Sequence, residues 1–146
     1  MSKSFARDKG QRAERAAVAL LQPIVDKVYA LAEVPEADWP KLIRNLQQTQ
    51  SGGFDIAGLE WLALEIKHQE NLNIPGWWRQ TLQQAGTTRV PVLMYKRNNV
   101  AWRVMMYGYL PARDLSVKCP VDIALPDFLA YFENRLTNAV KEFHRG

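Results

Sequence analysis

The chain is poor in cysteine and histidine, and this argues against several classes of protein. It has one cysteine, Cys119, and two histidines, His68 and His144, in 146 residues. One cysteine cannot form an internal disulfide, which agrees with a reducing cytoplasm. The histidines lack metal-ligand spacing, and no CxxC, P-loop or Ser-His-Asp pattern is present. Zinc-finger folding, nucleotide hydrolysis and acyl transfer are therefore disfavoured.

Long apolar runs are also missing. No stretch is long and apolar enough to span a bilayer, and residues 1–4 contain no apolar signal core. Apolar residues make up 47% of the chain and charged residues 23%, as in ordinary globular domains. With neither repeats nor a low-complexity linker, we expect a single domain over residues 1–146, no membrane partner and a cytoplasmic location.

Positive charge is mild in total and uneven along the chain. Nineteen Lys and Arg residues against fifteen Asp and Glu residues give a net charge of +4. The basic residues gather near the N-terminus and around a turn expected at 96–99: Lys3, Arg7, Lys9, Arg12, Arg15, Lys96, Arg97 and Arg103. Such clusters suit a phosphate backbone, although a solvated polar face is the other interpretation.

The most informative feature is Asp55 followed by Glu65-Ile66-Lys67 in an apolar strand pattern. Side chains alternate along a strand, so Glu65 and Lys67 share one face with Trp61, Ala63 and Gln69, and the leucines between them share the other. An unpaired charge is costly to bury. Two converging carboxylates fit a hard cation such as Mg²⁺, and a nearby lysine can orient water or neutralise developing charge.

A third carboxylate, Glu14, belongs to a helical pattern near the N-terminus. It continues the apolar stripe of Val18, Leu21 and Val25 at offsets of four, seven and eleven residues. This spacing points Glu14 inward, where it can join Asp55 and Glu65. The alternative is a glutamate at the edge of the stripe that extends to solvent or pairs with a neighbour of Arg15.

Local signals divide the rest of the chain into helices and strands. We expect a helix over 5–33 with a kink or break at Pro23, followed by a loop over 34–38. Residues 42–49 are ambiguous, because local signals favour a helix from Pro40. The remaining expected elements are strands at 54–57 and 60–68, a helix between Asn73 and Gly86, strands at 90–95 and 100–109, an irregular segment at 111–125, and a helix from Pro126.

These motifs resemble those of the PD-(D/E)xK nuclease superfamily, with Phe54 where the motif has proline. Gly10 to Arg15 reads Gly-x-x-x-Glu-Arg, which is similar to the first helix of archaeal Holliday junction resolvases. Together with 44–56, 77–80 and 91–93, the chain resembles the Holliday junction resolvases of tailed bacteriophages. The resemblance implies a strand at 42–49. It also implies an α/β, restriction-endonuclease-like α-β-β-β-α-β core over about 5–108, with a further strand and a C-terminal helix in the addition 109–146.

The resemblance also implies an activity, that of a Mg²⁺-dependent endonuclease acting on branched DNA, with Mn²⁺ as a substitute ion. Asp55 and Glu65 would ligate metal, Lys67 would position the attacking water, and Glu14 would complete the acidic cluster. Residues expected on the DNA side are Arg12, Arg15, Arg44, Gln48, Gln69 and Gln80. The alternatives are a nuclease of the same fold acting on flaps, ends or duplex, and a DNA-binding protein in which Asp55, Glu65 and Lys67 form an ordinary ion-pair cluster.

A homodimer is also expected, because a four-way junction needs two symmetric nicks. The final helix and the strand at 100–109 carry more apolar residues than a small sheet requires. The candidate interface residues are Phe128, Phe132, Phe143, Met105, Met106, Tyr107 and Tyr109.

Overall fold

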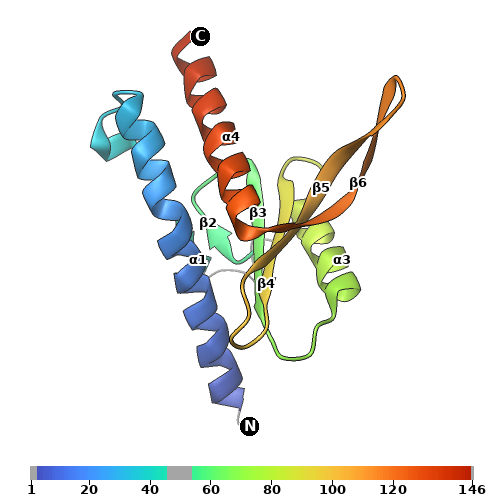
Figure 1. Ribbon diagram of the computed structural model, residues 1–146. Coiled ribbons are helices and arrows are strands. Elements are labelled where there is room, and N and C mark those ends of the chain that lie inside the picture. The colour runs from blue at the N-terminus through green and yellow to red at the C-terminus, as the bar shows by residue number, and fades with distance from the viewer. Residues whose placement is uncertain (1–2, 46–53, 146) are drawn as a thin grey trace.

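The protein is a mixed α/β structure built on one sheet. The computed structural model describes residues 3–45 and 54–145, and in these ranges it has a six-stranded mixed sheet and three α-helices (Figure 1). The elements in chain order are α1 (Lys3–Leu31), β1 (Ile43–Arg44), β2 (Ile56–Ala57), β3 (Leu62–His68), α3 (Ile74–Ala85), β4 (Val90–Lys96), β5 (Arg103–Ala112), β6 (Leu115–Ala124) and α4 (Leu125–Arg145). A short 3₁₀-helix at Glu36–Asp38 lies in the expected loop.

The strands lie in the sheet in their chain order, β1 to β6. The pair β3–β4 is parallel, because α3 carries the chain back across the sheet between them, and the other pairs are antiparallel. Helices α1 and α4 cover one face and α3 covers the other (Figure 1). Both faces of the central strands are therefore buried.

The main core lies between the sheet and the α1–α4 pair. Leu21, Val25, Phe128 and Phe132 have no exposed surface, and they pack with alternate residues of β3, β4 and β5. A smaller cluster on the other face joins Trp77 and Trp78 of α3 to residues of β4 and β5. Both tryptophans are buried and are core residues of this face.

Helix α1 runs without interruption through Pro23, so the predicted break is wrong. Proline removes one backbone hydrogen bond from a helix interior. Leu21 and Val25 flank it with fully buried side chains that hold both halves of the helix against the core. Tertiary packing thus outweighs the local penalty.

The ambiguous segment after Pro40 contains a two-residue strand, β1, in its described part. Ile43 and Arg44 pair with Ala57 and Ile56 of β2, which excludes the helix that local signals favoured at these two positions. Residues 46–53 are outside the described part of the chain, and Gln48 lies there. Gly58 ends β2 at φ 127°, and a Cβ there would lie 2.4 Å from the carbonyl oxygen of Lys41, so the close approach requires glycine.

The largest error of the sequence interpretation is at 111–125, where the structure has a long hairpin. β5 continues to Ala112 and β6 begins at Leu115, and the two strands pair over their whole length. The hairpin projects from the body of the molecule beside α4 (Figure 1). Its turn has no glycine, and Arg113 takes the positive φ of 56° that turn patterns assign to Gly or Asn. The expected turn at 96–99 is also longer, because β5 starts at Arg103.

The two later helices agree with their sequence signals. The Asn73 side chain caps α3 by accepting a hydrogen bond from the Gly76 N–H, and Gly86 ends the helix at φ 59°. In α4, the stripe of Phe128, Phe132, Leu136 and Val140 is buried in the core. None of the helices in the described ranges is long and apolar enough to cross a membrane.

Burial corrects the expected dimer surface. Phe128, Phe132 and Met106 are buried within the monomer and are not available to a partner. Met105 and Tyr107 are half-buried against the α3 cluster, and the Phe143 side chain lies outside the described part. Among the side chains of this set that the structure describes, only Tyr109 is well exposed, on the projecting hairpin.

Candidate active site

Strand β3 has the two-sided pattern that its alternation predicts. Leu62, Leu64 and Ile66 pack in the core under α1 and α4. Ala63 packs on the opposite face, which Glu65 shares by alternation. Trp61 is a correction: it precedes the strand and packs against Phe132 of α4, with the two ring centroids 6.1 Å apart.

Backbone hydrogen bonds fix Asp55 between β1 and β3. The Asp55 N–H donates to the carbonyl oxygen of Leu64 at 2.9 Å, and the Asn45 N–H donates to the carbonyl oxygen of Asp55 at 2.8 Å. The Asp55 Oδ2 accepts a hydrogen bond from the Ile66 N–H at 2.7 Å. The Ile56–Leu64 pairing sets Asp55 opposite Glu65, so the first acid of the motif reaches the second through sheet register.

Asp55 and Glu65 form a buried acid pair, with exposed fractions of 6% and 3%. Burial raises the pKa of Glu65 to about 8, and the Asp55 charge adds to this effect. Burial also raises the pKa of Asp55 to about 6, which the Ile66 N–H and Lys67 oppose and Glu14 favours. The two side chains share a hydrogen bond. Near neutral pH the pair therefore holds one proton, mostly on Glu65.

Lys67 lies beside the acid pair. Its Nζ is 3.5 Å from Oε1 of Glu65, and its side chain is 20% exposed. The other carboxylate oxygen of Glu65, Oε2, is buried and has no hydrogen-bond partner. Lys67 thus contacts only one of the two Glu65 oxygens. The other is a buried acceptor without a hydrogen bond, which costs free energy of folding.

Glu14 reaches the same region from α1, as its helical spacing predicts. It is close enough to Asp55 to raise the pKa of that carboxyl. Its own Oε2 accepts a hydrogen bond from Nε of Arg44 at 2.6 Å, in an ion pair whose side chains are 14% and 26% exposed. The sequence analysis placed both residues at the site but did not predict that they pair.

The residues present fit a divalent cation held by the acid pair. Arg44 is engaged by Glu14, so Lys67 and the proton on Glu65 balance the charges of the acid pair. A hard cation would take the place of that proton and give the unsatisfied Glu65 oxygen a partner. Among the described residues no three acidic, histidine or cysteine side chains form a ligand cluster, so Glu14 is a neighbour of the pair and not a third ligand in this geometry.

The expected DNA-binding residues are placed unevenly. Arg12 and Arg15 are exposed on α1, and Gln69 is exposed just after β3. Gln80 is half-buried on α3. Arg44 contacts Glu14, as above. Contact with DNA stays a prediction for all of these residues.

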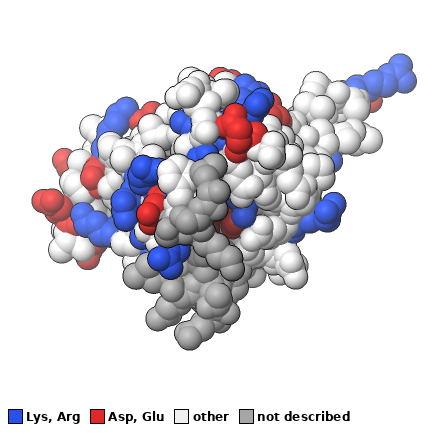
Figure 2. Space-filling view, turned by 90° about the horizontal axis from the view of Figure 1, so that it is seen from below, with Lys and Arg blue, Asp and Glu red and all other residues white. Residues whose placement is uncertain are grey.

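A basic cluster, Lys9, Arg12 and Lys96, surrounds His68 at the end of β3. Burial lowers the pKa of His68, and the charges of Lys9, Lys96 and Arg12 lower it further. The cluster lies on the α1 face of the sheet, because His68 alternates with the buried Ile66. Lys and Arg side chains are spread over this end of the molecule (Figure 2). The basic residues were expected from the sequence, but their meeting at His68 was not, because it depends on α1 crossing the end of the sheet.

A second polar group lies on the α3 face. Tyr95 of β4 and Arg103 of β5 both bond to Asp122 of β6: the Tyr95 hydroxyl donates to Oδ2, and Nε of Arg103 donates to Oδ1 at 2.7 Å. Burial and Asp122 raise the pKa of Tyr95 to about 12. The sequence analysis missed this group because it expected Asp122 in an irregular segment.

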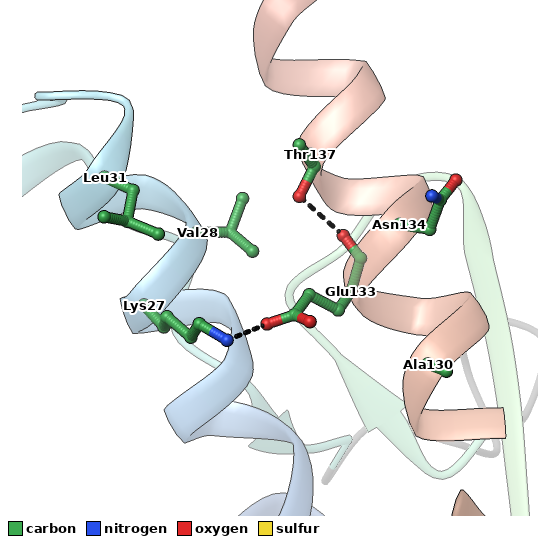
Figure 3. A pocket seen from close by; sticks show the side chains of 7 residues that line it. All are labelled: Lys27, Val28, Leu31, Ala130, Glu133, Asn134 and Thr137. Atoms are coloured by element: carbon green, nitrogen blue, oxygen red, sulfur yellow. Dashed lines mark hydrogen bonds and ion pairs between the residues drawn. The ribbon is translucent and has the colours of Figure 1, made fainter. Parts of the chain in front are cut away.

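A separate cavity of about 350 Å³ lies between α1 and α4. Lys27 and Glu133 form an ion pair of 2.5 Å across it, and Thr137 closes one side (Figure 3). The cavity shares no lining residue with the acid pair. Thr137 donates its hydroxyl proton to the Glu133 carbonyl, so this polar group is satisfied within α4.

Comparison of the chain with protein-family models, with curated proteins and with solved structures found no match. The function is therefore inferred from the residues of the chain itself.

Proposed function

We propose that the protein is a Mg²⁺-dependent DNA endonuclease with a restriction-endonuclease-like core. The observation that carries the proposal is the buried acid pair Asp55–Glu65 with Lys67 beside it. Two adjoining carboxyls whose pKa values are both raised by burial are an unfavourable arrangement unless function requires it. A divalent cation with a lysine next to it removes the penalty and suits phosphodiester hydrolysis.

Each residue has a role that its position supports. Asp55 and Glu65 would hold Mg²⁺, which supplies charge for the phosphoryl oxygens and acidifies the attacking water. Lys67 orients this water and offsets negative charge that develops as the water oxygen bonds to phosphorus and the bridging oxygen leaves. Glu14 is held by Arg44 next to Asp55 and adds negative potential that favours the cation.

A phosphate backbone is the substrate class that the surrounding charges favour. The basic cluster of Lys9, Arg12 and Lys96 lies at the end of β3 on one face of the sheet, and Arg103 lies on the other. Backbone contacts of this kind position DNA without reading its sequence. Mn²⁺ is the expected substitute ion, and bacterial cytoplasm is the proposed location.

Branched DNA, above all the four-way junction, is the proposed substrate, cut by a homodimer. The apolar side chains left exposed on the β5–β6 hairpin are Tyr109, Leu110, Leu115 and Val117. An exposed apolar group of this size on a projecting ribbon suits a contact with a second copy. A two-fold dimer then presents two sites for paired nicks.

A cleavage panel tests the proposal. Four-way junction, flap, linear duplex and single strand are incubated with the wild type and with Glu65→Gln, in Mg²⁺ or EDTA. We expect cleavage of the junction by the wild type in Mg²⁺ only. The exposed Glu60 supplies the matched control, Glu60→Gln, which should cut like the wild type. Full cleavage in EDTA, or by Glu65→Gln, would refute the assignment, whereas equal cleavage of duplex and junction would refute only the junction preference.

A further inference from the structure

A row of polar side chains crosses the sheet from Lys67 toward its far edge. Lys67 of β3 is paired in register with Tyr95 of β4, and Tyr95 is paired with Arg103 of β5. Partners in register share a face of the sheet. All three side chains therefore lie on the α3 face, which is also the face of Glu65.

Arg103 is held in a defined orientation within this row. Its Nε donates to Oδ1 of Asp122 at 2.7 Å, and one terminal nitrogen approaches the Asp122 carbonyl oxygen at 3.3 Å. Asp122 also accepts a hydrogen bond from Tyr95, which is buried against Trp77 of α3. The guanidinium is thus anchored on one edge, while 44% of the side chain remains exposed to solvent.

The spacing of the row fits a nucleic-acid strand. Neighbouring strands lie about 4.8 Å apart, so two strand spacings, roughly 10 Å, separate the backbone of Lys67 from that of Arg103. Phosphates of one DNA strand repeat about every 3.4 Å along the duplex axis. A strand whose scissile phosphate lies at Lys67 therefore brings a phosphate within about three nucleotides to Arg103.

We infer that Arg103 binds a backbone phosphate within about three nucleotides of the cut, and that Asp122 and Tyr95 are positioning residues for its guanidinium. The inference rests on the proposed nuclease function and adds to it the direction in which the DNA leaves the acid pair: past the end of β4 toward the start of β5, next to the part of the sheet that α3 covers. An anchored guanidinium forms directed hydrogen bonds to phosphate oxygens, which a flexible lysine does not.

Phosphate-by-phosphate neutralisation tests the inference. A series of four-way junctions is prepared, each with a single backbone phosphate replaced by a neutral methylphosphonate, and the affinity of the protein for each is measured in Ca²⁺. The position of the cut is mapped separately with the wild type in Mg²⁺. We expect one position within about three nucleotides of the cut where neutralisation weakens wild-type binding about tenfold and has no effect on Arg103→Gln. Arg135→Gln removes the same charge beside Trp61, at the other end of β3, and should keep the wild-type pattern.

Asp122→Asn separates orientation from net charge. If Arg103 acted by charge alone, removing the negative neighbour would strengthen binding. We expect that in Asp122→Asn neutralising the mapped phosphate weakens DNA binding less than in the wild type. Arg103→Lys should recover part of the wild-type affinity that Arg103→Gln loses. A wild type that cuts DNA, with Arg103→Gln showing an unchanged neutralisation pattern, would overturn the inference and leave the nuclease assignment intact. A wild type that cuts no DNA in the panel would overturn both.

Discussion

Replacing Glu65 by glutamine should stabilise the metal-free protein at alkaline pH. A buried carboxyl with a raised pKa binds its proton more tightly in the native than in the unfolded state. Such a group contributes stability below its unfolded pKa, and this stability is lost as pH rises through the native pKa. Glutamine keeps the shape and a hydrogen-bond donor toward Asp55 and never ionises. Wild type and variant should therefore differ little at pH 5 and diverge as pH rises.

The expected size follows from the position of Glu65. Burial and Asp55 raise the pKa of Glu65 from 4.5 to about 8. One pKa unit corresponds to about 1.4 kcal/mol, so between pH 5 and pH 8 the wild type should lose about 3 kcal/mol relative to Glu65→Gln. This is a large part of the stability of a typical domain. Asp55, whose pKa is raised to about 6, leaves a residual pH dependence in both proteins.

Urea unfolding in EDTA at pH 5, 6, 7 and 8 measures the difference. Glu60→Gln, at an exposed position, is the control and should follow the wild type. Millimolar Mg²⁺ should restore the free energy of unfolding of the wild type at pH 8 and leave that of Glu65→Gln unchanged, because a ligand stabilises only the state that binds it. A constant difference between wild type and Glu65→Gln across this pH range would refute the reasoning.

Two other predictions concern the neighbours of the acid pair, and a third concerns the β5–β6 hairpin. Lys67→Ala should lose cleavage by orders of magnitude while binding DNA in Ca²⁺ like the wild type; a lower melting temperature with full activity would make Lys67 only an ion-pair partner. Arg44→Gln should lower the free energy of unfolding by about 1–3 kcal/mol. In a double-mutant cycle, adding Glu14→Gln to the same chain should recover part of this loss. Additive effects of the two changes would contradict a direct pair. Leu115→Lys should convert the expected dimer to monomer in sedimentation, and an unchanged dimer would exclude the hairpin surface.

The sequence predicted the elements whose signals are local. Alternation in β3 assigned Glu65 to the face opposite the leucines, and the spacing of Glu14 pointed it toward Asp55. The cap at Asn73 and the final helix were also predicted correctly. In each case, one element of secondary structure determines the side-chain direction.

The errors have non-local causes. The β5–β6 hairpin lacks the usual local signals, because Arg113 and not glycine takes the positive φ of its turn and because its strands contain Pro111 and Pro120. Without that hairpin, Asp122 had no reason to meet Arg103. The Glu14–Arg44 pair likewise depends on how α1 crosses β1, which no local pattern specifies.

The central claim is that the acid pair is a metal site. The most direct test is to measure Mg²⁺ binding together with the protons released on binding. Calorimetric titration at pH 7 is repeated in two buffers of different ionisation enthalpy, which counts the protons released. Glu65, with its pKa raised to about 8, holds a proton that a cation must displace. We expect saturable binding of Mg²⁺ with release of about one proton, and neither in Glu65→Gln. No binding by the wild type at millimolar Mg²⁺, or equal binding by Glu65→Gln, would contradict the account.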